Sequence, residues 1–105
     1  MEGTYEYGGA PMPTRWVPPE VLKRSKWSVK SDVWAFGVTM WEALSYGLRP
    51  YMDMTDKEVS AFVRAGKRLA RPAAATDDAF WSLVTRCWAK VARDRPDFEA
   101  LANMF

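Results

Sequence analysis

The segment from Asp32 to Ser45 constrains the fold of this chain most, because its apolar residues surround the predicted helix instead of lining one face. These residues are Val33, Trp34, Phe36, Val38, Met40, Trp41, Ala43 and Leu44. Ser31 can cap the helix, and Asp32 lies in its first turn, where the helix dipole favours a carboxylate. A helix that is apolar on all sides is a buried helix, so the rest of the fold must be built around it.

Further helices are predicted before and after this central one. Residues 19–25 favour one or two helical turns that open on a proline. Thr55 and Glu58 form a capping box ahead of an amphipathic helix. The next helix has Thr76 as its expected cap, with apolar residues at helical spacing, and the last opens at Pro96. We therefore predict a mainly α fold with four principal helices and no convincing strand.

The first 19 residues differ from the rest in composition. They hold three of the six Gly and four of the seven Pro, which break helices and favour turns. This segment is predicted to be a loop.

Composition excludes several classes of function. The net charge is +2 with no block of five like charges, so we expect no nucleic-acid partner. Without His there are no imidazole bases and no His-containing zinc sites. Cys87 is the only cysteine, which fits a reducing compartment. The apolar run from Val33 to Trp41 is shorter than the roughly 18–20 residues of a membrane span, and no signal peptide is evident, so we expect a cytoplasmic protein.

Five short motifs resemble, in order and spacing, the C-terminal lobe of protein-tyrosine kinases. They are Pro13 to Glu20 (PTRWVPPE), Ser31 to Val38 (SDVWAFGV), Gly47 with Pro50-Tyr51, Cys87-Trp88, and Asp94 to Phe98 (DRPDF). The resemblance covers about residues 5 to 105, and the stretch from Val38 to Gly47 looks especially like Syk-type cytoplasmic tyrosine kinases. It implies an incomplete kinase fold without N-lobe sheet or catalytic loop. Residues 1–19 would be the activation-segment and substrate-positioning loop, and residues 20–105 the helical C-lobe.

The resemblance implies substrate-side roles for the leading segment. Pro13, Arg15 and Trp16 match the P-x-[KR]-W segment that forms a platform under the substrate tyrosine in tyrosine kinases. A proline has a fixed φ and a flat apolar face, so it can support a phenol ring. Tyr5 and Tyr7 match the phosphorylatable tyrosine, Tyr5 being the better match. The alternatives are an ordinary Pro-rich turn and two tyrosines without function in a frayed terminus.

The resemblance also implies structural roles in the helical part. Glu20 would pair with Arg95 in a buried ion pair, the alternative being two solvated charges. Asp32 in the family accepts hydrogen bonds from the catalytic loop, which this sequence does not contain, so its role here is that of a first-turn carboxylate. Trp34, Gly37 and Trp88 fall within the family's structural motifs.

The motifs that the sequence lacks determine the expected mechanism. Phosphoryl transfer in this family uses a Gly-rich loop, an H-R-D aspartate and a D-F-G aspartate, and none of these motifs is present. We therefore expect no catalytic, cofactor or metal site in these residues, although the intact family domain implies ATP and magnesium. The family reaction is phosphorylation of protein tyrosine, and we expect this chain to be inactive alone.

Two hypotheses remain for the chain as a whole. It is either a section of a tyrosine kinase domain, with the remainder of that domain as its partner, or a non-catalytic helical interaction module of the pseudokinase type. The central helix favours the kinase-domain hypothesis, because a helix that is apolar on all sides needs covering elements that this sequence does not encode. If about 400 Å² of this helix stayed bare, the lost stabilisation would be on the order of 10 kcal/mol, so we expect a loosely packed or aggregation-prone monomer.

Overall fold

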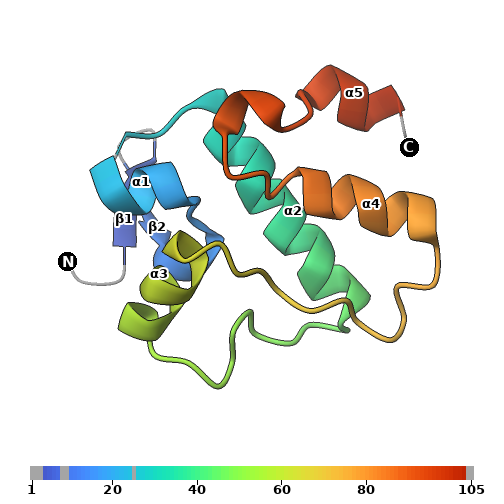
Figure 1. Ribbon diagram of the computed structural model, residues 1–105, viewed down its shortest axis with the longest axis horizontal. Coiled ribbons are helices and arrows are strands. Elements are labelled where there is room, and N and C mark those ends of the chain that lie inside the picture. Colours follow the sequence, from blue (N-terminus) through green and yellow to red (C-terminus); the bar gives the residue numbers. More distant parts are fainter. Residues whose placement is uncertain (1–3, 8–9, 25, 104–105) are drawn as a thin grey trace.

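A computed structural model describes residues 4–7, 10–24 and 26–103 of the chain, and its elements are mostly helical (Figure 1). In chain order they are strands β1 (Thr4–Tyr7) and β2 (Ala10–Pro13), the 3-10 turn η1 (Thr14–Trp16), helices α1 (Pro19–Arg24), α2 (Val29–Leu44), α3 (Asp56–Arg64) and α4 (Asp78–Arg86), the 3-10 turn η2 (Ala92–Asp94), and helix α5 (Phe98–Asn103). The mainly α fold predicted from the sequence is confirmed.

The leading segment is a short hairpin, so the prediction of a loop without strands is wrong for these residues. Strands β1 and β2 pair antiparallel, with Thr4 opposite Pro13 and Tyr7 opposite Ala10. The prolines of β2 lack an N–H but have a φ that suits extended backbone, and each strand of a two-stranded ribbon is an edge strand, where proline is tolerated. In the sequence, β1 alternates polar and apolar residues from Thr4 to Tyr7, but the prolines of β2 argue against a second strand.

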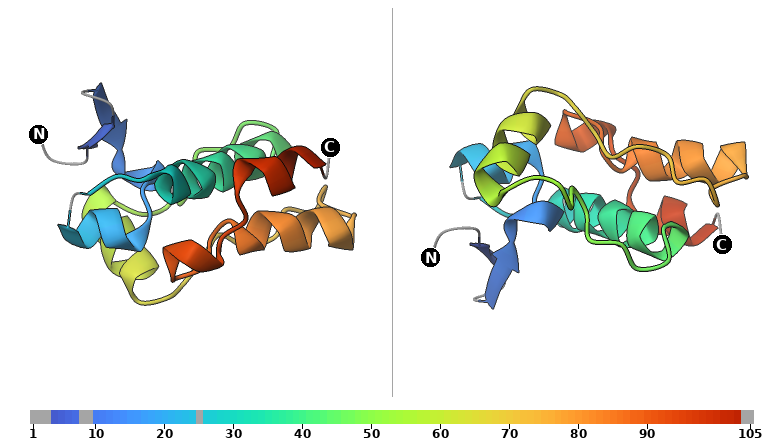
Figure 2. Two further views of the ribbon diagram at one scale, coloured as in Figure 1. Left: turned by 90° about the horizontal axis from the view of Figure 1, so that it is seen from above. Right: turned by 90° about the horizontal axis from the view of Figure 1, so that it is seen from below.

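Helix α2 lies in the middle of the molecule (Figure 1). One side carries α1, α3 and the hairpin, and the other carries α4 and α5 (Figures 1 and 2). The helix starts earlier than predicted, because Ser28 is its N-cap and the Ser31 hydroxyl accepts from the Ser28 N–H at 3.0 Å. Ser31 is therefore the inner member of a capping box, and Val29 and Lys30 belong to the helix instead of the connection before it.

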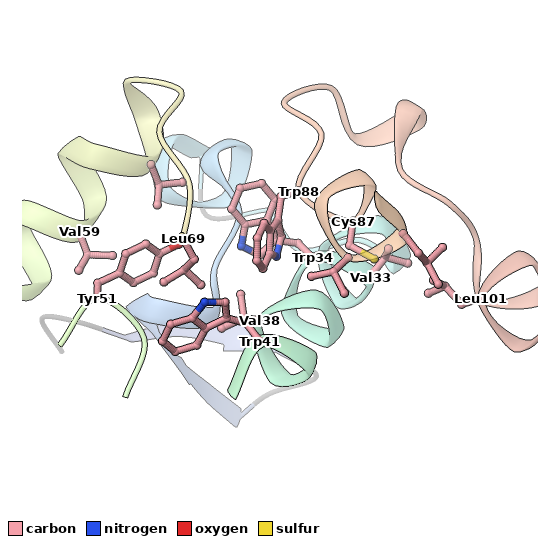
Figure 3. Packing of buried hydrophobic residues seen from close by; sticks show 13 residues of the cluster. Val33, Trp34, Val38, Trp41, Tyr51, Val59, Leu69, Cys87, Trp88 and Leu101 are labelled. Carbon is pink, nitrogen blue, oxygen red and sulfur yellow. The ribbon is translucent and has the colours of Figure 1, made fainter. Parts of the chain in front are cut away.

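The core forms around α2 (Figure 3). Its buried members are Val33, Trp34, Val38, Trp41, Tyr51, Val59, Val63, Leu69, Leu83, Val84, Cys87, Trp88 and Leu101. One face of α2 is only partly covered in the described part of the chain. Phe36, whose ring lies edge-on to that of Phe98 in α5, and Met40 are half-buried there, and Thr39 and Ala43 are exposed. The burial predicted for all sides of this helix is thus incomplete within these residues.

The other helix starts differ in how well the sequence predicted them. The capping box of Thr55 and Glu58 is present at α3. Asp77, not Thr76, caps α4, and its carboxylate accepts from the Phe80 N–H at 3.1 Å. Helix α5 starts at Phe98, two residues after the predicted opening. Asp is at least as good an N-cap as Thr, and its negative charge also interacts favourably with the positive end of the helix dipole, so Asp77 is the preferred cap.

No helix in the described ranges is long and apolar enough to cross a membrane.

Candidate functional site

The site predicted from the P-x-[KR]-W segment lies where the hairpin joins the helical part. Pro13 is the last residue of β2 and is exposed, with φ −63° and ψ 140°. The turn η1 follows at once and packs against both α2 and α3. An exposed proline therefore stands on a turn that the helical core holds in place.

Arg15 anchors this turn from inside. Its side chain is only 5% exposed. Nη1 donates to the carbonyl oxygens of Pro50 (3.0 Å) and Tyr51 (2.7 Å), and Nη2 donates to that of Met54 (2.6 Å). Nε lies 3.3 Å from Asp56 Oδ1, without hydrogen-bond geometry. The guanidinium is thus engaged with the α2–α3 loop and points into the protein.

Trp16 fixes the same turn to the central helix. Its Nε1 donates to Glu42 Oε1 at 2.8 Å. Glu42 is the only charged residue between Val33 and Leu44 of α2. The sequence did not assign Glu42 to the site, although a lone charge in an otherwise apolar helix segment signals a buried polar contact.

The two phosphorylation candidates lie in the hairpin, whereas Tyr51, which was not predicted as a site residue, lies in the α2–α3 loop. Tyr5 and Tyr7, the phosphorylation candidates, have their backbones in β1, and their side chains lie outside the described residues. Tyr51, by contrast, is buried beneath the turn and has a φ of 53°. Burial raises the pKa of its hydroxyl to about 12, while the nearby Arg68 and Arg15 act in the opposite direction.

Glu20 and Arg95 form a bidentate ion pair between α1 and the segment before α5. Arg95 Nη1 donates to Glu20 Oε2 and Nη2 to Glu20 Oε1, both at 2.8 Å. The Arg95 side chain is 0% exposed and that of Glu20 31%. Arg95 also donates to the carbonyl oxygens of Ala89 (2.9 Å) and Lys30 (3.1 Å), so one guanidinium joins three segments. This is the pairing that the resemblance implies.

Trp34 lies between two guanidinium groups. Its ring centroid is 4.8 Å from Cζ of Arg68 and 5.0 Å from Cζ of Arg95. Arg68 Nε also donates to the carbonyl oxygen of Trp88 at 2.9 Å, and burial lowers the pKa of Arg68. Arg68 was not predicted from the sequence, because this residue lies in the link between α3 and α4, where no motif or periodicity distinguishes it from its neighbours.

The remaining predicted residues contribute to the packing of α2. Asp32 Oδ1 accepts from Trp27 Nε1 at 2.8 Å. Gly37 lies so close to the end of α4 that a Cβ built on it would be 2.7 Å from Cys87 Cβ and 2.8 Å from Trp88 Nε1. Trp88 is buried at this contact, and its ring lies edge-on to that of Trp81, with the ring centroids 5.8 Å apart. These contacts make the α2–α4 packing a tight fit.

A central helix packed on both sides, a short helix tied to the last segment by an ion pair, and an exposed proline on an anchored turn are the arrangement that the resemblance to a kinase C-lobe implies. The chain belongs to the protein tyrosine and serine/threonine kinase family, whose model matches residues 1–105.

Relatives support the tyrosine kinase domain in particular. The chain is 46% identical over 86 residues to tyrosine-protein kinase ZAP-70 of Homo sapiens, which covers 82% of this chain and 14% of that protein. It is 40% identical over 104 residues to the epidermal growth factor receptor of Apis mellifera, covering 99% and 8% respectively. It is also 40% identical over 103 residues to ephrin type-A receptor 5 of Homo sapiens, covering 98% and 10%.

The chain thus spans between 8% and 14% of the length of these relatives. The narrower resemblance to Syk-type kinases stays a prediction.

Proposed function

We propose that this chain is the C-lobe section of a protein-tyrosine kinase domain, in which it positions the tyrosine of a protein substrate and transfers no phosphate by itself. The observation that carries the proposal is the exposed Pro13 at the start of the anchored turn η1. Arg15 and Trp16 hold that turn to the α2–α3 loop and to α2.

The substrate would be bound through the proline ring. A flat apolar face with a fixed φ supports a phenol ring at little entropic cost. A phenol is longer than a serine side chain by the length of its ring, so a platform that supports the ring favours tyrosine over serine. Arg15 contributes by fixing the height and direction of Pro13, because its donors face the protein interior.

The chemistry of transfer would come from the rest of a kinase domain. In the intact domain, ATP and magnesium supply the phosphoryl group and offset its charge. The residues that hold them belong to motifs that do not occur in these 105 residues. The partners in this proposal are a tyrosine-bearing protein and the remainder of the domain, and the setting is the cytoplasm. Phosphorylation at Tyr5 or Tyr7 would add a charge of roughly −1.5 to −2 to the hairpin segment.

A chimera tests this proposal. The section of the ZAP-70 kinase domain that matches this chain is replaced by the corresponding residues of this chain. We expect the chimera to phosphorylate a tyrosine peptide and not the same peptide with serine in place of tyrosine. The substitution Pro13→Ala should lower kcat/KM on the order of tenfold, because the substrate hydroxyl is then misplaced.

The control is Pro72→Ala, the same change in the link between α3 and α4, which should leave kcat/KM unchanged. Equal activity toward the serine peptide, or full activity of the Pro13→Ala chimera, would contradict the proposal. A folded chimera that binds the peptide and transfers nothing would favour the non-catalytic interaction module.

A further inference from the structure

We propose that a basic cleft between α1, α3 and the segment before η2 binds an acidic peptide segment of a partner protein. The cleft has a volume of about 510 Å³. Four cations line it: Lys23, Arg24, Arg64 and Lys90. The volume lies within the range of roughly 300–1,000 Å³ that is usual for ligand-binding clefts.

The four cations come from separate parts of the chain. Lys23 and Arg24 end α1, Arg64 ends α3, and Lys90 precedes η2. All four are exposed, and none takes part in an ion pair between described residues. Three elements therefore bring unpaired positive charge to one hollow.

The carboxylate and the helix ends at this cleft do not balance that charge. Glu20 is the one carboxylate in the lining, and its two oxygens bind the buried Arg95. Cations are common in the last turn of a helix, where they offset the negative end of the dipole. Each helix end carries only about half a negative charge, so the ends of α1 and α3 offset about one of the four cations. A net positive cleft remains.

The shape and the apolar part of the lining favour a peptide over a membrane surface. Pro19, Val91 and Ala92 line the same hollow, and Val91 is 45% exposed. A concave site that combines cations with apolar side chains fits a segment in which carboxylates flank an apolar residue. A lipid headgroup layer is broad and flat and would need the cations on a raised face.

The cleft is separate from the proposed substrate platform. None of its lining residues belongs to the segment from Pro13 to Trp16. The chimera of the preceding section can fail while peptide binding holds, and the reverse is also true. The two proposals therefore fail independently.

The test is fluorescence anisotropy with the full 105-residue chain and a fluorescein-labelled peptide of sequence Glu-Asp-Glu-Leu-Glu-Asp-Glu, at physiological salt. The variant is Lys23→Gln combined with Lys90→Gln. We expect a roughly tenfold weaker affinity, because two exposed charge contacts with the peptide are lost. The matched control is Lys26→Gln with Lys57→Gln, two exposed lysines outside the cleft lining, which should change the affinity less than about twofold.

Three results would overturn the proposal. If the control variant loses as much affinity as the cleft variant, binding follows net charge and not the cleft. If phosphatidylserine vesicles bind the chain while the peptide does not, the cations serve a membrane surface. Replacement of the peptide's leucine by glycine should also weaken binding, because the apolar lining then loses its contact; unchanged affinity would count against the cleft as the site.

Discussion

At Gly37 the packing of two helices depends on the absence of one methyl group. Any Cβ there would come within 3 Å of Cys87 and Trp88. We predict that Gly37→Ala destabilises the chain, because overpacking costs roughly 1–3 kcal/mol, against about 1 kcal/mol gained in helix propensity. The measurement is the urea midpoint followed by Trp fluorescence in dilute solution. Thr39→Ala, on the exposed side of the same helix, is the control and should leave the midpoint nearly unchanged; a higher midpoint for Gly37→Ala would refute the tight fit.

Two buried acidic groups make the stability depend on alkaline pH. Burial raises the pKa of the Cys87 thiol from 9.0 to about 11 and that of Tyr51 from 10.0 to about 12. Between these values the unfolded state releases the proton and the folded state keeps it, so the free energy of unfolding falls as pH rises. We predict a decline from about pH 9 upward, measured by urea denaturation at a series of pH values. Cys87→Ala and Tyr51→Phe should each make the free energy of unfolding depend less steeply on pH. An unchanged pH dependence in both variants would show that these two groups are not its cause.

The residues of the site differ in how far the sequence reveals them. Pro13, Glu20 and Arg95 stand in motifs, so their placement could be anticipated. Arg68 could not, because its contacts with Trp34 and Trp88 join segments distant in sequence. The inward direction of Arg15 was also not evident, since a motif gives residue types and spacing but not which way a side chain points.

At the scale of elements, two neighbouring residues, Thr76 and Asp77, could each cap the start of α4. Asp77 accepts the Phe80 N–H, and Thr76 is exposed without this role. We predict that Asp77→Ala costs about 1 kcal/mol and that Thr76→Ala costs less than about 0.5 kcal/mol. Urea denaturation compares the two variants. Equal losses, or a larger loss for Thr76→Ala, would mean that α4 starts elsewhere.

The ion pair between Glu20 and Arg95 joins α1 to the segment before α5. Removal of one partner of a buried, hydrogen-bonded pair costs roughly 3–5 kcal/mol, because the other charge is left uncompensated. Glu20→Ala leaves the fully buried Arg95 without a countercharge, so we expect its loss to lie within this range. Arg95→Ala leaves only the partly exposed Glu20 unpaired but also removes the bonds to Ala89 and Lys30, so we expect a loss of similar size. In a double-mutant cycle the two losses should be markedly less than additive. Additive losses would show that the pair contributes no coupling.

Elements with a strong local pattern were predictable, and those formed by pairing were not. The helices carry apolar periodicity or caps that act within a few residues, which is why α2, α3 and α4 were found with small errors at their ends. The β1–β2 hairpin has local signals in the alternation from Thr4 to Tyr7 and in the Gly8-Gly9 that follows, but the prolines of β2 argue against a strand, and the pairing itself is not local. Cap choice between adjacent residues also depends on where the core places the helix.

For the whole molecule, the partly covered face of α2 is the main consequence of the fold. Phe36 and Met40 are half-buried on that face, beside the exposed Thr39 and Ala43. We predict concentration-dependent association of the isolated chain, measured by light scattering, and a reduction by Met40→Lys. The control is Met52→Lys, which adds the same charge at a methionine that is 56% exposed in the α2–α3 loop. A cooperative melt with a dispersed proton NMR spectrum and no association would contradict this prediction.

The central claim is that these residues position a tyrosine while the chemistry of transfer lies elsewhere in the domain. The most direct test measures transfer of labelled phosphate from ATP-magnesium to a tyrosine peptide, with the purified chain and with the ZAP-70 chimera under the same conditions. We expect transfer by the chimera and none by the chain alone. Transfer by the chain alone would contradict the claim.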